Sequence, residues 1–304
     1  MSVVSLFPSA TEVAAELGVV PDAVSHQCDH PSAVADRPTL TGLVRELNAD
    51  PDALDRVVAH DDVYYLDGDV LATVDPDVVL TQGVCGVCAL DAGLARRGID
   101  RLGLDAAVLD VHATDLADVL ANVERIGAAI GRGEAAADLR ADLDTRIEAV
   151  RSGEVRATDG PDGSRPRVAV LDWTDPIRHG GLWTPELIDV AGGRSGLAEP
   201  GARSRRIEPS ELRAYDPEVV VVAPCGYDVD EAADAAAALF DRPDLSEVAA
   251  VRNDRVYAVD GGAYFNRHSH RVVDSLELLA SLLHPNAFEE PNGDSVRRWS
   301  LIRS

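Results

Sequence analysis

The stretch LATVDPDVVLTQ (Leu71–Gln82) recurs later in the chain, without a gap, as LRAYDPEVVVVA (Leu212–Ala223). Asp75 aligns with Asp216, 141 residues further on, and each is followed by a proline, an acid and a continuously apolar run. Such runs are typical of parallel strands that are covered on both faces. The repeat therefore predicts two similar lobes, each built around a parallel sheet.

Short β-branched runs alternate with helical patterns along the rest of the chain, which favours an α/β fold. In the first lobe, Val3–Leu6 and Val78–Thr81 are expected to share one sheet. In the second lobe, Val168–Leu171 and Val219–Ala223 are expected to share another. A second, weaker similarity between the two halves supports two lobes. Thr11 and Thr184 each stand where a helix is expected to begin, with a glutamate in its first turn. The predicted strands are Val3–Leu6, Ala23–Ser25, Val78–Thr81, Val168–Leu171, Val219–Ala223 and Val256–Val259.

A helical pattern from about Thr114 to Arg151 separates the two halves. Its apolar residues recur with the period of one buried helix face. Gly131-Arg-Gly133 is expected to bend or split the run, because glycine weakens a helix. We therefore predict three parts: an N-terminal α/β lobe over 1–113, a helical linker over 114–151 and a C-terminal α/β lobe over 152–304.

Composition narrows the class of partner. The 304 residues are 46% apolar, which allows a packed core, and the net charge is −25 with no lysine in the chain. So acidic a protein repels nucleic acid and anionic membranes, and the composition is typical of halophilic proteins. No apolar run is long enough to span a bilayer. The first residues, MSVVSLFPSATE, have no export-signal pattern, so a cytoplasmic protein with reduced thiols is expected.

The unusual residues gather in loops that follow the predicted strands. In doubly wound sheets, ligands bind beyond the carboxyl ends of the strands, so these loops predict a binding site. Aromatic residues are normally core residues, and their presence in such loops indicates a broad apolar contact for a ligand. The set comprises all four cysteines (Cys28, Cys85, Cys88, Cys225) and the aromatics Phe7, Trp173, Tyr227, Tyr264 and Phe265, with Trp183 nearby.

Several segments together resemble the iron-complex and cobalamin substrate-binding proteins of ABC importers, and most closely a cobalamin-binding-like subgroup. The resemblance extends to about Pro285. Typical members carry an export signal and lack the cysteine set, so the chain departs from the pattern twice. The segments are VVSLFPSATE (Val3–Glu12), VSHQCDHP (Val24–Pro31), Asp75–Cys88, GRSGLAEPGARSRRIEPSEL (Gly193–Leu212) and APCGYD (Ala223–Asp228).

The resemblance implies two Rossmann-like lobes joined by a long helical linker, with the ligand in a cleft between the lobes. It also implies a binding protein rather than an enzyme, a cobalamin, other corrinoid or iron chelate as ligand, and an ABC permease and ATPase as partners. The candidate ligand-binding residues are Phe7, Pro8, Ser9, Cys28, Asp29, Gln82, Cys85, Cys88, Trp173, Trp183, Arg205, Cys225, Tyr227, Tyr264, Phe265 and Arg267.

The spacing Cys85-Gly-Val-Cys88 leaves three hypotheses open. A cysteine just ahead of a helix has a lowered pKa and could belong to a redox dithiol. Alternatively, the thiolates of Cys28, Cys85, Cys88 and Cys225, with His26, Asp29 or His30 as substitutes, could bind zinc, copper(I) or an iron–sulfur cluster. The leading hypothesis is a pocket wall that faces a planar metal chelate. The arginine-rich GARSRRIEP (Gly201–Pro209) either binds an anionic group or pairs with nearby acids.

Overall fold

The computed structural model describes residues 1–47, 51–83, 90, 92–157, 165–289 and 293–302. The chain divides into two compact lobes. The first lobe comprises Met1–Ala113 and Asp118–Ala141, and the second comprises Thr114–Ala117 and Asp142–Ser304. The α/β fold class expected from the sequence is confirmed, while the predicted boundaries and the cleft stay predictions.

The first lobe contains a four-stranded parallel sheet of order β2-β1-β6-β7. The predicted pairing of the first strand with the repeat strand in one sheet is confirmed, because Val3 lies opposite Val78. The strands are β1 (Val3–Ser5), β2 (Ala23–Val24), β6 (Val78–Thr81) and β7 (Ala107–Asp110). The helices are α1 (Pro8–Glu16), α2 (Pro51–Arg56), α3 (Gly68–Val74) and α4 (Ala92–Leu102), with short 3-10 turns at Ser32–Val34 and Val44–Glu46.

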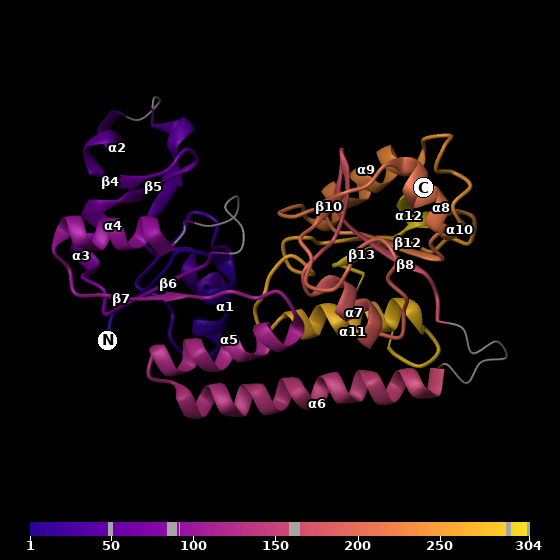
Figure 1. Ribbon diagram of the computed structural model, residues 1–304, viewed down its shortest axis with the longest axis horizontal. Coiled ribbons are helices and arrows are strands. Elements are labelled where there is room, and N and C mark those ends of the chain that lie inside the picture. Colours follow the sequence, from indigo (N-terminus) through magenta and orange to yellow (C-terminus); the bar gives the residue numbers. More distant parts are fainter. Residues whose placement is uncertain (48–50, 84–89, 91, 158–164, 290–292, 303–304) are drawn as a thin grey trace. The chain divides into compact units, whose positions relative to one another are not determined.

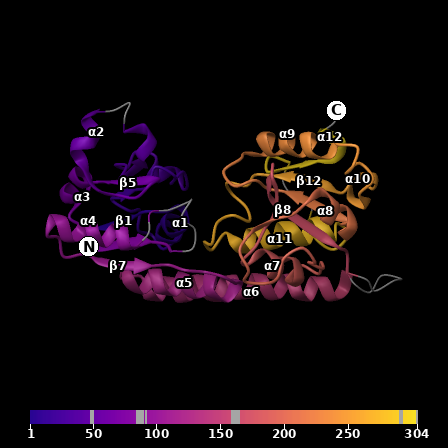
Figure 2. The same cartoon turned by 45° about the horizontal axis from the view of Figure 1, so that its top comes forward.

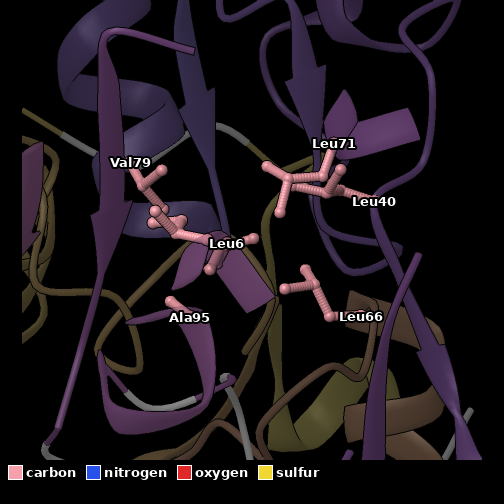
Figure 3. Close-up of a pocket in the computed structure, with 7 residues that line it drawn as sticks. Leu6, Leu40, Leu66, Leu71, Val79 and Ala95 are labelled. Atoms are coloured by element: carbon pink, nitrogen blue, oxygen red, sulfur yellow. The ribbon is translucent and has the colours of Figure 1, made fainter. Parts of the chain in front are cut away.

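A second sheet in the first lobe is absent from the sequence-based prediction. It is antiparallel, with the order β3 (Thr41–Leu43), β5 (Tyr64–Asp67) and β4 (Val57–His60). The core of the lobe lies between this sheet, the parallel sheet and α4. Figure 3 shows Leu66 of β5, Leu40 just before β3 and Leu6 just after β1 gathered there. The seam between them is too small for a water molecule, so it is packed core rather than a ligand pocket.

The second lobe contains a six-stranded sheet of order β10-β9-β8-β11-β12-β13. Its centre is parallel, with Val168 opposite Val219 as predicted, and its outer strands are antiparallel. In Figure 2, α9 and α12 cover one face of the sheet, and α7 and α11 cover the other. The strands are β8 (Val168–Thr174), β9 (Ile177–His179), β10 (Arg205–Arg206), β11 (Val219–Val222), β12 (Val256–Val259) and β13 (Val296–Arg298). The helices are α7 (Thr184–Val190), α8 (Pro209–Tyr215), α9 (Val229–Phe240), α10 (Ala249–Arg252), α11 (Val272–Leu283) and α12 (Trp299–Ile302).

The sequence repeat has one structural role in both lobes. Asp75 and Asp216 each end a helix in the left-handed conformation, with φ of 45° and 48°. The acid two residues further on then accepts a hydrogen bond from the backbone N–H that precedes the neighbouring parallel strand. Asp77 binds the N–H of Ser2 at 2.7 Å, and Glu218 binds that of Arg167 at 2.9 Å. The motif thus joins a helix end to the register of two strands.

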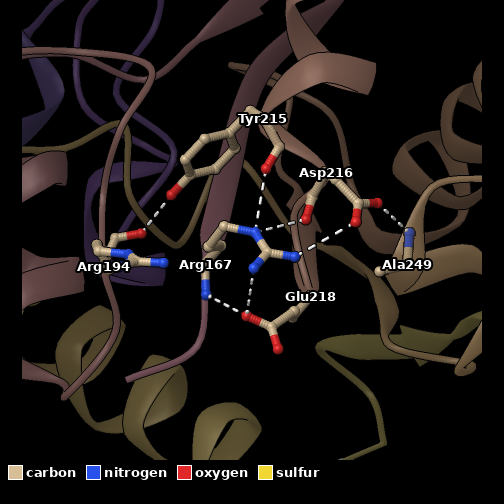
Figure 4. A network of polar contacts seen from close by, with 6 residues as sticks. All are labelled: Arg167, Arg194, Tyr215, Asp216, Glu218 and Ala249. Atoms are coloured by element: carbon tan, nitrogen blue, oxygen red, sulfur yellow. Dashed lines mark hydrogen bonds and ion pairs between the residues drawn. The ribbon is translucent and has the colours of Figure 1, made fainter. Parts of the chain in front are cut away.

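In the second lobe this join is reinforced by a polar network around Arg167 (Figure 4). The Nε atom of Arg167 donates to the carbonyl oxygens of Tyr215, at 3.1 Å, and Asp216, at 2.8 Å. Its guanidinium also pairs with the carboxylates of Asp216 and Glu218, and Asp216 accepts from the N–H of Ala249 at 2.9 Å. The network lies at the amino ends of β8 and β11, and it therefore holds in register the strands whose carboxyl ends carry the candidate site.

The helical segment consists of α5 (Leu116–Ala129) and α6 (Gly133–Ala157), which lie side by side in Figure 1. The predicted break is confirmed, because Gly131 adopts a φ of 70° between them. A methyl group on Gly127 would overlap Ala136, so the glycine lets the two helices approach closely. The predicted helix opening is confirmed at Thr184 but wrong at Thr11, because α1 already begins at Pro8, a favoured first position for proline.

Arg146 of α6 binds α11 within the second lobe. Its Nη2 atom lies 2.6 Å from both Asp274 and Glu277, and its Nε atom donates to Glu277 at 2.9 Å. These acids, with Glu277 as the larger cause, raise the pKa of Arg146. Such a forked arrangement fixes geometry better than a single surface pair.

Replacing Arg146 by alanine is therefore expected to lower the free energy of unfolding of the second lobe by about 1 kcal/mol. Tryptophan fluorescence during urea unfolding measures this lobe, because Trp173, Trp183 and Trp299 all belong to it. Arg242→Ala is the control, because Arg242 pairs with Asp244 two residues away on the surface and its loss should change little. Equal effects of the two variants would contradict a special role for Arg146.

Candidate functional site

The carboxyl ends of the parallel strands carry the candidate residues in each lobe. In the first lobe, the chain leaves β1 at Leu6 and Phe7, β2 at Ser25, and β6 at Gln82. In the second lobe, Trp173 lies near the end of β8, and the segments after β11 and β12 carry Tyr227 and Tyr264. Placement at this edge is the expected position of a ligand site in such sheets.

The segment after β2 is fastened to the first lobe by side-chain hydrogen bonds. The Nδ1 atom of His26 lies 2.8 Å from the hydroxyl of Thr41, and the amide of Gln27 donates to the hydroxyl of Tyr64 at 3.0 Å. Cys28 is half-buried, with its sulfur 3.1 Å from the hydroxyl of Thr11 in α1. His26 and the following Asp29 are exposed. The segment thus presents polar side chains from a fixed backbone.

Several predicted first-lobe residues are structural rather than exposed. Phe7 has 1% of its surface exposed and belongs to the core, and Ser9 and Gln82 are also buried. Pro8 begins α1 at a position suited to proline. A buried ring cannot offer a broad face to a ligand, so Phe7 supports the edge from behind.

The four cysteines are only partly placed. Cys28 is half-buried and Cys225 is exposed, and they belong to different lobes. Cys85 and Cys88 lie outside the described residues. The expectation that their sulfurs lie close to that of Cys28 therefore stays a prediction. Among the residues that the structure does describe, no group of three or more His, Cys, Asp or Glu side chains is arranged to hold a metal ion. The thiolate-site and dithiol hypotheses therefore stay predictions.

In the second lobe, two aromatic rings from different loops meet. Trp173 and Tyr227 contact edge to face, with ring centroids 5.4 Å apart. The indole N–H of Trp173 donates to the carbonyl of Asp175 at 2.9 Å, and the carbonyl of Tyr227 accepts from the N–H of Gly261 at 2.9 Å. The rings of Trp173 and Tyr227 and the nearby Tyr264 are each partly exposed. They therefore offer aromatic surface at this edge.

The Tyr264 segment is held by a frame of buried groups. Phe265, in the left-handed conformation with φ of 65°, donates its N–H to Ser275 at 3.0 Å, and its carbonyl accepts from the indole of Trp183 at 2.8 Å. Asn266 donates its amide to the carbonyls of Ala223 and Gly261, each at 2.9 Å. Phe265 and Trp183 are 3% and 5% exposed. Both predicted ligand residues thus belong to the supporting frame.

Asn266 was not predicted from the sequence. Its amide joins the segments that follow β11 and β12, and so positions Tyr264 relative to Tyr227. A sequence signal existed in the run Gly261-Gly-Ala-Tyr-Phe-Asn, because asparagine in a glycine-rich turn commonly hydrogen-bonds nearby backbone. That signal does not say which carbonyls it would reach.

The arginine-rich segment pairs with its own acids. Arg205 lies 3.1 Å from Glu211 and also donates to the carbonyl of Leu197, while Arg206 lies 3.2 Å from Glu208. The pKa of Glu211 is lowered mainly by the hydrogen bond from the backbone N–H of Glu208, and to a smaller extent by the hydrogen bond from Arg205. The alternative of local pairing thus describes Arg205 and Arg206 in this structure. Arg267 is half-buried in the segment after β12.

Three titratable groups near these edges have shifted pKa values. Burial raises the pKa of Asp172, against the opposing hydrogen bond from Ser204 and the charge of Arg178. His26 is exposed as a whole residue, but its neighbours remove enough water from the ring to lower its pKa, and Glu46 opposes this. Burial lowers the pKa of His179, which is 0% exposed, to about 4.

The comparisons with known proteins concern nearly the whole chain. A family model described as periplasmic binding protein matches residues 3–262. A periplasmic heme-binding protein from Pseudomonas aeruginosa is 18% identical, with 98% of this chain and 97% of that chain covered and a TM-score of 0.74. The vitamin B12 binding protein BtuF of Vibrio cholerae is 19% identical, with 93% and 96% covered and a TM-score of 0.67. The heme-binding protein HutB of Vibrio cholerae is 17% identical, with 94% and 99% covered and a TM-score of 0.68.

At these identities the solved structures establish the fold and no more. No curated protein matches the chain in sequence. The predicted cytoplasmic location is wrong, because the matching family and these similar structures are periplasmic, which points to a place outside the cytoplasmic membrane. A missing signal pattern was weak evidence, since location depends on a segment that contributes nothing to the fold. Within the described parts of the chain, no helix combines the length and apolarity needed to cross a bilayer.

Proposed function

Because this chain belongs to the periplasmic binding protein family, we propose that it binds a metal-containing small molecule, a corrinoid or an iron chelate such as heme. Structurally similar proteins are described as binding heme or vitamin B12, which supports this class of ligand. Members of the family are substrate-binding transport proteins rather than enzymes. The chain accordingly holds its ligand without changing it.

The observation that carries the proposal is the aromatic edge of the second lobe. Trp173, Tyr227 and Tyr264 come from three segments and are each partly exposed. Large planar macrocycles need broad apolar contact, and aromatic side chains provide it with little loss of conformational entropy. The frame around Asn266 and Phe265 holds two of these segments in place before any ligand arrives. Preorganisation of this kind increases affinity.

The remaining contacts proposed for the ligand are polar. In the first lobe they are Cys28 and Asp29 after β2, Pro8 and Ser9 after β1, and Gln82, Cys85 and Cys88 after β6. In the second lobe, Cys225 is exposed two residues before Tyr227, and Arg267, three residues after Tyr264, is the arginine proposed to bind an anionic group of the ligand. Arg205 would have to exchange its bond to Glu211 for one to the ligand.

We also propose an ABC permease and its ATPase as partners, because one of the similar structures is described as an ABC transporter substrate-binding protein. The bound ligand would be the cargo that the importer takes up. Co-purification with a permease encoded nearby, in the presence and absence of ligand, tests this partner directly.

Titration of the purified protein with cobinamide, cobalamin, hemin and a ferric chelate, followed by visible absorption and calorimetry, tests the ligand class. Saturable binding of at least one of them, with a shifted visible band, is the expected result. Failure of all four to bind, together with disulfide reduction that depends on Cys85, would replace the proposal with the redox hypothesis.

Replacing Trp173 or Tyr264 by alanine is expected to weaken ligand binding by about 1–3 kcal/mol through lost apolar contact. Tyr264→Phe keeps the ring and is the matched control, so it should bind nearly as well as the unchanged protein. Calorimetry gives the affinities, and urea unfolding shows whether the fold is intact. Unchanged affinity in both alanine variants would place the ligand elsewhere.

A further inference from the structure

His26 is an exposed histidine whose ring is held in one orientation. Its Nδ1 atom lies 2.8 Å from the Thr41 hydroxyl oxygen, and its backbone N–H donates to the same oxygen at 3.3 Å. Its ring also contacts that of Tyr64, with centroids 5.5 Å apart. Since Tyr64 in turn accepts from Gln27, the ring and its backbone are both fastened to the antiparallel sheet of the first lobe.

The hydroxyl of Thr41 lies on the Nδ1 side of the His26 ring. Its oxygen is 2.8 Å from Nδ1 and 3.1 Å from the hydroxyl of Ser25. A neutral imidazole carries one proton, and in the tautomer whose Nδ1–H donates to Thr41, the Nε2 atom carries the lone pair. Because His26 is an exposed residue, its Nε2 side is open to a ligand.

We propose that Nε2 of His26 is an axial ligand to the metal of the bound molecule. Histidines that bind metals almost always donate their other ring N–H to an orienting partner, and Thr41 is that partner here. The lone pair of Nε2 forms the new bond and a water leaves the metal, so no proton or electron moves. This inference rests on the proposed function and adds a specific ligand class: iron or cobalt complexes with an exchangeable axial position.

Cobalt(II) cobinamide is the sharpest probe, because it has no nitrogenous base of its own. A nitrogen splitting in its electron paramagnetic resonance spectrum must then come from the protein. The unchanged protein is expected to show this splitting. His26→Ala should lose it, and added imidazole should restore it. The matched control is His30→Ala, an exposed histidine in the same segment, which should keep the splitting.

Thr41→Val provides a second variant that leaves the imidazole in place. Loss of the orienting bond should weaken axial binding about 10- to 100-fold, with unchanged urea unfolding as the sign of an intact fold. Cobinamide that binds without nitrogen splitting, or splitting that persists in His26→Ala, would overturn the role of His26 while leaving the proposed function standing. If the unchanged protein binds none of cobinamide, cobalamin, hemin and the ferric chelate, the proposed function fails, and this inference fails with it.

Discussion

Replacing Gly261 by alanine is expected to lower the free energy of unfolding of the second lobe by about 3 kcal/mol. The added methyl group would overlap the backbone carbonyl of Pro224, and a backbone atom cannot move aside as a flexible side chain can. Gly261 also donates its N–H to Tyr227 at 2.9 Å, so the close approach joins the segments after β11 and β12. Urea unfolding followed by tryptophan fluorescence measures the loss.

Gly262→Ala is the matched control for that experiment. Its methyl group would come nearest to a side-chain oxygen of Asp260, at 3.2 Å, which can shift slightly. We expect less than about 1 kcal/mol of destabilisation in this variant. Because Tyr227 and Tyr264 flank the close approach, Gly261→Ala should also weaken ligand binding. Equal stability of the two variants would show that the two segments are not held as closely as described.

Acidification from pH 7 to pH 4 is expected to remove about 3 kcal/mol of stability from the second lobe through His179 alone. Burial lowers the pKa of this imidazole to about 4, with the hydrogen bond to Gly180 opposing and the charge of Arg205 assisting. Below the ordinary histidine value of 6.5, the unfolded chain binds a proton that the folded protein does not. The stability is therefore fully present near neutral pH and is lost as pH falls toward 4.

His179→Asn separates this contribution from other titrations. The asparagine amide can keep the donor to the carbonyl of Gly180, which Nδ1 holds at 2.7 Å, but it does not titrate. Urea unfolding at several pH values should give a steeper loss of stability in the unchanged protein than in the variant. Subtracting one slope of unfolding free energy against pH from the other removes the contributions of the other histidines and of the carboxylates, which both proteins share. Parallel slopes would mean that the pKa of His179 is not lowered in the folded protein.

The two lobes follow from local chemistry that the sequence displays. The repeated Asp-Pro-acid run before an apolar strand requires few distant residues: the aspartate ends a helix in the left-handed conformation, and the acid caps the neighbouring strand. Apolar runs such as Val219–Val222 identify covered parallel strands, and Gly131 breaks the linker helix because glycine adopts a positive φ easily. These features were predicted for that reason.

The antiparallel sheet of the first lobe could not be foreseen in the same way. Its strands are short, and the pairing of Thr41 with Leu66 or His60 with Tyr65 depends on side chains that pack from elsewhere in the lobe. The outer strands β9, β10 and β13 are equally short. Strand propensity over three or four residues is weak, so tertiary packing decides whether such segments pair.

The candidate site was likewise predicted in part from the sequence and decided in part by the tertiary structure. Residue type and position after a strand were enough to nominate Trp173, Tyr227 and Tyr264. Burial was not visible, however, and it turned Phe7, Trp183 and Phe265 into supports. The orientation of the His26 ring depends on Thr41, and the position of the Cys28 sulfur on Thr11, and both threonines belong to other segments of the chain. A hydrogen bond has to be traced to a partner in space, so the protonation of a ligand atom is a property of the tertiary structure and not of the residue alone.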